Sequence, residues 1–425
     1  MNNNPDKPRE FDAVLGGEAP PPVSGVVLGG IEGVKSRLKS SVVEVKVAAL
    51  SEALNYGDIG LDLVINTLTN SSEQVQRFAA KLLKQRGGDK GKQALLNSNP
   101  YLAFTMMTDW LVKEFNSEVD IINPEITAYS LNLQLDWPPL YAKVRSIVKS
   151  GSAPSFRAEI QRLDREQTTK KFQVFLHNPQ IHDIQALHCH YPSHCFIDIF
   201  IEAKNQLSKL KALFWGDPQD DPYKDTSRDK LTRNMSLVLE AYPNLEILHI
   251  RGDAKGDYYD PLGSCLSFTL AEHHYLKTLI IETNFLPEST VNEIVNLNLP
   301  NLEYLELWIG NAGLDAVSLI PKISEQFPKL QYLGIRSCED ADEVAKALVS
   351  SPLIERLKIL DLSMGEMTNQ GVEYLLNCPA VNQLHTLNLS MNYISNTEVL
   401  DQLACHVIAQ PQDGEYGDRY SALHE

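Results

Sequence analysis

The chain has 425 residues, which is enough for two or three domains, or for one solenoid and a smaller module. Hydrophobic residues make up 43% of it and charged residues 22%, as in most folded proteins. Residues 1–100 hold 12 basic and 11 acidic residues, and the remaining 26 basic and 44 acidic residues give residues 101–425 a net charge of −18. Such an acidic region repels phosphate backbones, so we expect no nucleic-acid ligand.

The cellular compartment is indicated by three features of the sequence. No segment approaches 18 consecutive apolar residues, so we expect no membrane span. The start of the chain lacks the basic residues and apolar run of a signal peptide. Six cysteines without regular spacing favour a reducing compartment over a disulfide framework. We therefore predict a cytoplasmic protein.

The N-terminal region is predicted to be an arm followed by helices. Residues 1–30 are rich in glycine and proline, which favours a flexible arm. A phosphate-binding loop is not indicated, because Val34 separates Gly33 from Lys35 and breaks the required spacing. In residues 31–100 the pattern Val-x-x-(Ala/Phe)-Ala, with Gly twelve residues after its Val, begins at Val45 and again at Val75. This 30-residue period predicts paired antiparallel helices of HEAT type.

The next region gives weaker signals. Residues 101–165 are expected to form a connecting helical region, with one helix over Phe104–Phe115. Pro- and Gly-containing stretches near Asp136 and Ser150 look like boundaries.

A leucine-rich repeat dominates the second part of the chain. The pattern Leu-x-x-Leu-x-Leu, with conservative apolar replacements, occurs eight times. The copies begin at Ile184, Leu210, Leu245, Leu276, Leu302, Leu330, Leu357 and Leu384. Five of the seven intervals between them are 26 to 28 residues, so the repeat is not accidental.

Each copy predicts one strand of a parallel sheet. Alternate side chains of a strand point to opposite faces, so the fourth and sixth motif residues enter the core together. Stacked copies then share one continuous core. The ninth positions, Asn284, Cys338 and Asn392, could hydrogen-bond backbone groups where the chain leaves the strand.

The segments between the strands predict helices on the outside of the sheet. Four of them have apolar residues three or four apart: Glu288–Leu297, Asp315–Phe327, Asp342–Val349 and Asn369–Leu376. We predict an eight-coil α/β leucine-rich-repeat horseshoe over residues 166–408, preceded by the small all-α HEAT-like module. The segment Phe172–His177 is interpreted as a capping strand, the polar stretch 217–225 as a loop insertion, and residues 409–425 as an acidic tail.

Two resemblances support this organisation. The stretches NLEYLELWIG (301–310), LQYLGIRSCEDADEVAKAL (330–348) and LKILDLSMGEMTNQGVEYLL (357–376) resemble a bacterial, ribonuclease-inhibitor-like leucine-rich-repeat family of unassigned function, over about residues 214–425. That family has no established catalytic residues, so the resemblance implies a fold and not an activity. The leader segments PREFDAVLGG (8–17) and VLGGIEGVK (27–35) resemble the opening of cyanobacterial HEAT-repeat proteins. Related modules occur in phycobilin lyases and phycobilisome-degradation factors.

The concave face of the horseshoe is the predicted binding surface. Motif positions three, five and seven should face solvent there, and Tyr304, Trp308, Tyr332 and Arg336 should form one contiguous patch around Glu306, because neighbouring strands are about 4.8 Å apart. Tyr, Trp and Arg are enriched at interface hot spots, and Gly334 should leave a dent for a partner group. The same rows contain Phe214, His249 and Arg251 as further candidates.

An alternative for this patch is purely structural: the aromatic rings stack on each other and Arg336 pairs with Glu306. To separate the two, we expect alanine at both Trp308 and Tyr332 to abolish binding without changing the fold.

One cluster could suggest a metal site. The segment HCHYPSHC (188–195) holds five side chains that can bind zinc. The register argues against such a site, because Cys189 should point into the core while His188 and His190 point to the concave face. Solvated histidines and a core cysteine are therefore preferred, and no metal, cofactor or catalytic residue is predicted.

These observations predict a non-enzymatic scaffold or adaptor that binds a protein partner on the concave face. The alternative, from the second resemblance, is a pigment- or cofactor-handling factor that acts through the HEAT-like module on phycobiliproteins.

Overall fold

The computed structural model describes residues 30–412, apart from residues 71, 111, 117–121, 124, 134–141, 144, 147–155, 191, 193–194, 217–233, 253–265, 270–271, 284 and 311–312. It divides into two compact units, Met1–Asp109 and Trp110–Glu425. The predicted flexible arm, the polar insertion 217–225, Asn284 and most of the acidic tail lie outside the described residues.

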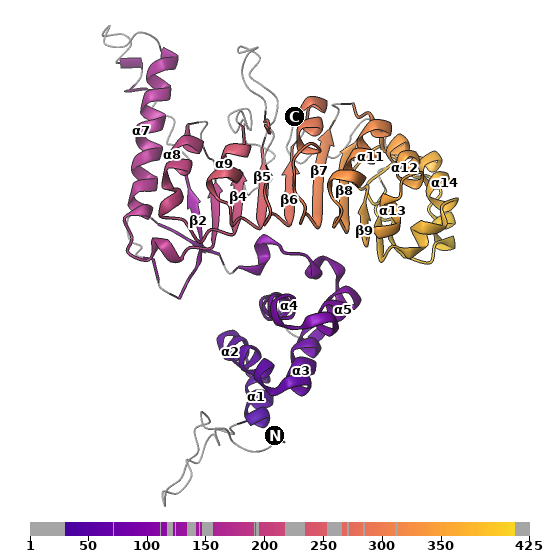
Figure 1. Ribbon diagram of the computed structural model, residues 1–425, viewed down its shortest axis with the longest axis horizontal. Helices are drawn as coiled ribbons and strands as arrows, with labels where there is room; N and C mark the ends of the chain where they lie inside the picture. Colours follow the sequence, from indigo (N-terminus) through magenta and orange to yellow (C-terminus); the bar gives the residue numbers. More distant parts are fainter. Residues whose placement is uncertain are drawn as a thin grey trace, which may run out of the picture. The chain divides into compact units, whose positions relative to one another are not determined.

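The first unit is helical (Figure 1). Its helices are α1 (Gly30–Leu38), α2 (Val43–Ala53), α3 (Gly57–Asn70), α4 (Glu73–Arg86) and α5 (Gly88–Ser98), with short 3-10 turns η1 (Leu54–Tyr56), η2 (Pro100–Ala103) and η3 (Met107–Asp109). They enclose a core of their own that includes the fully buried Val34, Leu50, Val64, Val75 and Leu83. The apolar spacing along the helices supplies this core.

The helices of this unit repeat as two pairs. Helices α2 and α4 begin 30 residues apart, and α3 and α5 begin at Gly57 and Gly88, whose φ values are +62° and +56°. Glycine adopts this left-handed conformation without the steric cost of a Cβ atom. In the first pair a Cβ on Gly60 would lie 1.7 Å from the Ala53 carbonyl oxygen. The tight turn between paired helices therefore depends on these glycines.

A buried ion pair ties the end of the first unit to α4. Lys84 Nζ lies 2.7 Å from each carboxylate oxygen of Asp109 and donates a hydrogen bond to the Phe104 carbonyl. Burial raises the pKa of Asp109, and the charge of Lys84 opposes that rise. The chain up to Asp109 thus belongs with the helices. The predicted helix over Phe104–Phe115 is wrong: that segment contains η3 and the two-residue strand Lys113–Glu114.

The second unit is built on a parallel sheet whose strands follow one another in chain order. Among the described residues they are β1 (Lys113–Glu114), β2 (Ala128–Asn132), β3 (Ala186–His190), β4 (Ala212–Gly216), β5 (Ile247–Arg251), β6 (Thr278–Glu282), β7 (Tyr304–Gly310), β8 (Tyr332–Cys338), β9 (Ile359–Asp361), β10 (Thr386–Asn388) and β11 (His406–Ile408). All eight motif copies form strands, β3 to β10. The eight-coil prediction is too small, because β1, β2 and β11 extend the sheet at both ends. The sheet therefore begins well before residue 166.

The strands share one register. Leu279 pairs with Leu305, Leu305 with Leu333, and Leu333 with Leu360. Each of these leucines is fully buried. This column of aligned leucines is what the repeat predicts, and it confirms that the coils share a continuous core.

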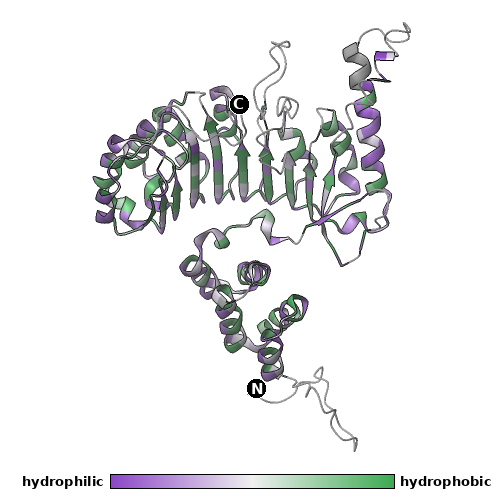
Figure 2. Cartoon of the chain, turned by 180° about the vertical axis from the view of Figure 1, so that it is seen from behind, coloured by the Kyte–Doolittle hydropathy of each residue, from purple (hydrophilic) through white to green (hydrophobic). Residues whose placement is uncertain are grey.

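Helices cover one face of the sheet (Figure 1). They are α7 (Phe156–Leu176), α8 (Phe196–Glu202), α9 (Ser236–Ala241), α10 (Glu288–Ile294), α11 (Ala316–Gln326), α12 (Ala341–Val349), α13 (Leu353–Arg356) and α14 (Asn369–Leu376), with 3-10 turns η4 (Ile181–Asp183), η5 (Ala203–Asn205), η7 (Pro379–Gln383) and η8 (Glu398–Gln402). The four predicted inter-strand helices are confirmed as α10, α11, α12 and α14. Figure 2 shows the strands largely hydrophobic, as a sheet needs when one face is packed under helices. None of the described helices has the length and apolar character needed to cross a membrane.

The segment Phe172–His177 belongs to the end of a helix and not to a strand. The predicted capping strand over Phe172–His177 is wrong, because Phe172, Phe175 and Leu176 lie three and four residues apart and bury one face of α7. The Phe172 ring meets Phe196 edge-on at 5.0 Å, and Phe115 meets Phe175 in the same way at 5.0 Å. Aromatic packing thus covers the end of the core.

Near the ends of β8, β9 and β10, one residue in each coil adopts a left-handed backbone conformation. The eighth motif residues Ser337, Met364 and Met391 have φ values of 53°, 63° and 57°. At the ninth position, Asn392 donates to the carbonyl oxygens of Leu362 and Leu389 and accepts from the Met367 N–H. The predicted backbone-pairing role of the ninth residue is confirmed for Asn392, while Cys338 is a buried core residue.

Candidate functional site

The candidate site lies on the concave face, defined here as the sheet face that carries no helices. Strand pairing places Tyr304 beside Tyr332, Glu306 beside Gly334, and Trp308 beside Arg336, as predicted. The expectation that the three aromatic residues face solvent is wrong. Tyr304 is 3% exposed, Tyr332 1% and Trp308 6%, because their side chains pack on one another.

The two tyrosines form the floor of this arrangement. Their rings stack face to face, with centroids 3.6 Å apart and planes 6° apart. Burial, followed by the nearby carboxylates, raises the pKa of both hydroxyls well above its usual range. Both hydroxyls therefore stay protonated and act as hydrogen-bond donors.

Glu306 receives those donors. Its Oε2 accepts from the hydroxyls of Tyr304 at 2.6 Å and Tyr332 at 2.9 Å. Its Oε1 accepts from Trp308 Nε1 at 2.8 Å and Arg336 Nη1 at 2.9 Å. A buried carboxylate is tolerated when its oxygens are paired and hydrogen-bonded, as here. We call these five residues the Glu306 cage.

Arg336 links the cage to the next coil. Its guanidinium carbon lies 4.3 Å from the centre of the Trp308 ring, and its Nε donates to Ser363 Oγ at 3.2 Å. Burial alone would lower the pKa of Arg336, but the charges of Glu306 and Asp361 raise it, so the side chain stays charged. Its side chain keeps 17% of its surface exposed.

Asp361 is a member of the network that the sequence prediction did not select. It accepts from the Ser363 N–H and hydroxyl at 3.0 and 2.6 Å, and from Asn388 Nδ2 at 3.0 Å. The signal that could have identified it is its row: Asp361 pairs with Gly334, which pairs with Glu306. The two acids share a row across one glycine.

The predicted dent at Gly334 is filled. A Cβ atom there would lie 3.0 Å from Glu306 Cγ and 3.1 Å from both Cε1 and the hydroxyl oxygen of Tyr332. Glycine is therefore needed at position 334, because a side chain there would block the contact between Tyr332 and Glu306. It does not leave a space for a partner group.

The other three predicted site residues form a second group on β4 and β5. The Phe214 ring meets the His249 ring edge-on at 4.7 Å, and Phe214 is buried. Glu282, on β6, lies 3.1 Å from His249 Nε2 and 3.3 Å from Arg251 Nε. Burial alone would raise the pKa of Glu282, but His249 and then Arg251 lower it. Arg251 and Glu282 therefore form a partly exposed ion pair on the concave face.

The histidine segment follows the predicted register. Cys189 is fully buried in the core, where burial raises its thiol pKa, while His188 and His190 lie on the concave side. His188 is not solvated as expected, because its Nε2 is buried and has no hydrogen-bond partner in the described part of the chain. Burial, then His190 and His249, lower its pKa to about 4. Residues 191 and 193–194 lie outside the description, and the described residues contain no group of three or more metal-capable side chains.

The arrangement matches the structural alternative that the sequence offered, since the aromatic rings stack and Arg336 pairs with Glu306. The role of the eight predicted residues in binding stays a prediction. What the concave face presents to solvent is a strip of partly exposed polar side chains, with Arg251, Glu282 and Arg336 near its centre.

The repeated strands, their common register and the helices on one face define a leucine-rich-repeat-like α/β protein. No family model matches the chain, and no curated protein matches it. Solved structures do match. A protein from Bacteroides fragilis aligns with a TM-score of 0.49 and 22% identity, covering 69% of this chain and 76% of the other. An internalin from Listeria monocytogenes aligns with a TM-score of 0.30 and 17% identity, covering 56% and 69%.

Proposed function

We propose that this chain is a non-enzymatic scaffold that binds a protein partner on the concave face of its leucine-rich-repeat sheet. The observation that supports this most is the Glu306 cage. Four donors, two of which are the hydroxyls of the stacked tyrosines, hold the Glu306 carboxylate in place. The face above them is therefore ordered before any partner binds. A surface that is already ordered loses less conformational entropy on association.

We assign the contact with the partner to the strip of partly exposed charged side chains, and not to the buried aromatic rings. Arg251, Glu282 and Arg336 have side chains that are 14%, 16% and 17% exposed. Partly desolvated charges of this kind set specificity and orientation at interfaces. The aromatic residues act beneath them as a rigid support.

A charge exchange tests the proposal. Partners are first identified by affinity purification and mass spectrometry with the full chain. The double variant Arg251→Glu with Glu282→Arg keeps an ion pair within the sheet but reverses the charges that a partner meets. We expect at least about a tenfold loss of affinity for the recovered partner, measured by calorimetry, with an unchanged circular dichroism spectrum.

The matched control exchanges the exposed pair Asp183 and Lys209, which lies 2.7 Å apart outside the concave rows. This variant should bind the partner normally. Unchanged affinity after the concave exchange, or an equal loss in the control, would reject the concave face as the binding surface.

The burial of the rings also changes an earlier expectation. Alanine at Trp308 and Tyr332 cannot serve as a clean binding test, because Trp308 and Tyr332 are 6% and 1% exposed and both donate to Glu306. Removing two large buried aromatic side chains costs on the order of 3–5 kcal/mol each. That variant is expected to lose stability before its binding can be measured.

We also propose that the first unit is a HEAT-like module and that the protein is cytoplasmic. The first proposal is supported by the repeat of two helix pairs with left-handed Gly57 and Gly88 at equivalent positions. The second is supported by the six cysteines, whose positions lack the regular spacing of a disulfide framework. The pigment- or cofactor-handling alternative stays a prediction. The alternative would be favoured by a partner that no longer binds after deletion of residues 1–100 but still binds the double variant Arg251→Glu with Glu282→Arg.

A further inference from the structure

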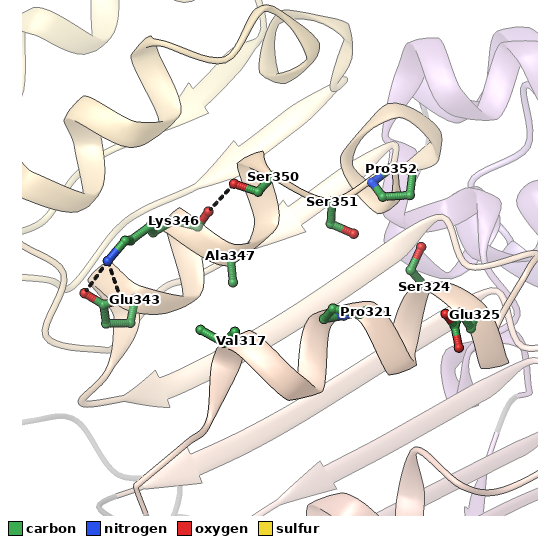
Figure 3. A pocket seen from close by; sticks show the side chains of 10 residues that line it. All are labelled: Val317, Pro321, Ser324, Glu325, Glu343, Lys346, Ala347, Ser350, Ser351 and Pro352. Carbon is green, nitrogen blue, oxygen red and sulfur yellow. Dashed lines mark hydrogen bonds and ion pairs between the residues drawn. The ribbon is translucent and has the colours of Figure 1, made fainter.

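A groove lies on the helical face of the sheet, away from the concave rows. It has a volume of about 420 Å³ and runs between α11 and α12 (Figure 3). Val317, Pro321 and Ser324 line it from successive turns of α11, and Lys346, Ala347 and Ser350 from α12. The side chains nearest the middle, Pro321 and Ala347, are small, so the two helices leave a channel between them.

The α11 wall of the groove is largely apolar and open. Val317 is 71% exposed, the highest value among the large hydrophobic residues that the structure describes as exposed. Val317, Pro321 and Ser324 lie at spacings of four and three residues, so this wall is about 10 Å long at 1.5 Å per residue. That length matches two turns of a second helix, whose apolar side chains recur at the same spacing.

A missing hydrogen bond marks the same wall. Pro321 lies inside α11 and has no N–H, so it cannot donate to the carbonyl oxygen of Val317 one turn earlier. Both residues line the groove. The Pro321 ring stands beside that carbonyl oxygen in place of an N–H, so this part of the wall is apolar.

The rim is acidic. Glu325 and Glu343 border the groove, and Lys346 offsets one of them by pairing with Glu343 at 3.0 Å. The surrounding residues 101–425 carry a net charge of −18. A partner with lysine or arginine beside its apolar side chains is therefore favoured both at the rim and at long range.

We propose that the groove between α11 and α12 is a second interaction surface, which receives a basic amphipathic helix of a partner protein. Apolar side chains of that helix fill the space between Val317 and Ala347. Its lysine or arginine side chains reach Glu325 and Glu343. This surface is independent of the concave-face proposal.

The test uses the full chain and a defined probe. The probe is a fluorescein-labelled 18-residue peptide with leucine at every third or fourth position and lysine elsewhere, and its twin has glutamate in place of lysine. Fluorescence anisotropy should show saturable binding of the lysine peptide only. Ala347→Trp, which fills the groove, and Glu325→Lys, which reverses the rim, should each weaken binding by about tenfold.

The matched control is Glu240→Lys, which makes the same change of net charge at an exposed position of α9. It should alter binding by less than about twofold. The proposal is overturned if the lysine peptide does not bind, if the glutamate twin binds equally well, or if Glu240→Lys weakens binding as much as Glu325→Lys. It is also overturned if Ala347→Trp, folded by circular dichroism, binds as tightly as the unmodified chain.

Discussion

The carboxylate of Glu306 shows how a charged side chain can be part of a buried face. Glu306 is only 4% exposed, yet each of its oxygens accepts two hydrogen bonds. Arg336 supplies a compensating charge within hydrogen-bond distance. The cost of burying the carboxylate is offset only while this set is complete.

We predict that Glu306→Gln lowers the free energy of unfolding by about 3–5 kcal/mol. The substitution places an amide donor among four donors and leaves the buried guanidinium of Arg336 without its nearest carboxylate. Urea denaturation followed by circular dichroism measures the change. Glu303→Gln, at a partly exposed position just before β7, is the control and should cost less than about 1 kcal/mol. Equal effects of the two substitutions would contradict the cage.

The pKa of His188 predicts a pH dependence of stability. The folded pKa of about 4 lies below the ordinary value of histidine, so the unfolded chain binds the proton more readily. Stability is therefore complete above the unfolded pKa and falls as the pH drops from about 6.5 towards 4. The neighbouring His190 and His249 oppose the same protonation.

We expect the unmodified chain to lose on the order of 2 kcal/mol of unfolding free energy through His188 between pH 7.5 and 5. His188→Gln cannot take up this proton, so its stability should fall by correspondingly less over the same range. Chemical denaturation at the two pH values measures both losses. Parallel losses in the two proteins would show that His188 titrates normally in the folded state.

At the scale of elements, adjacent outer helices are joined by specific polar contacts. Asp342, in the first turn of α12, accepts from the N–H groups of Thr368 and Gly371 at 2.9 Å each and from the Thr368 hydroxyl at 2.6 Å. These bonds satisfy donors at the start of α14 that have no partner within that helix. One carboxylate thus holds two consecutive coils together.

Gly371→Ala tests this joint. Alanine normally stabilises a helix by about 1 kcal/mol relative to glycine. Here its Cβ would lie 2.4 Å from Asp342 Oδ1 and 2.8 Å from Met367 Cγ. We therefore predict a loss of about 1–3 kcal/mol of unfolding free energy, measured by urea denaturation. Gln370→Ala, at an exposed site of the same helix, should be neutral or slightly stabilising. A stabilising Gly371→Ala would refute the close contact.

The elements that could be predicted from the sequence are those that carry the repeat. Strands β3 to β10 follow from the leucine motif, and helices α10, α11, α12 and α14 from apolar residues three or four apart between the strands. β1 and β11 lack the motif, and β2 carries it only as Ile126-x-x-Tyr129-x-Leu131, with tyrosine at the fourth position. The pairing of these strands depends on a neighbouring strand more than on their own pattern. The segment Phe172–His177 was too short to distinguish a strand from the last turns of α7.

At the scale of the whole molecule, the repeat register predicted which side chains are neighbours but not how exposed they are. Pairs such as Trp308 and Arg336 follow from the strand spacing. Burial of the cage depends on ring stacking and on the path of Tyr332 over Gly334, which involve side-chain conformations that the motif does not encode. The two compact units, each with its own core, coincide with the two repeats, one of paired helices and one of parallel strands.

The network around Glu306 changes how the C-terminal part of the solenoid should come apart. In a simple repeat array each coil interacts only with its neighbours, so the terminal coils can fray one after another. Here hydrogen bonds continue from Tyr304 and Trp308 on β7, through Tyr332 and Arg336 on β8, to Asp361 on β9 and Asn388 on β10. Opening any one of these strands leaves polar side chains on its neighbour without one of their hydrogen-bond partners. The four coils should therefore exchange their amide hydrogens as a single cooperative block, opening together or not at all.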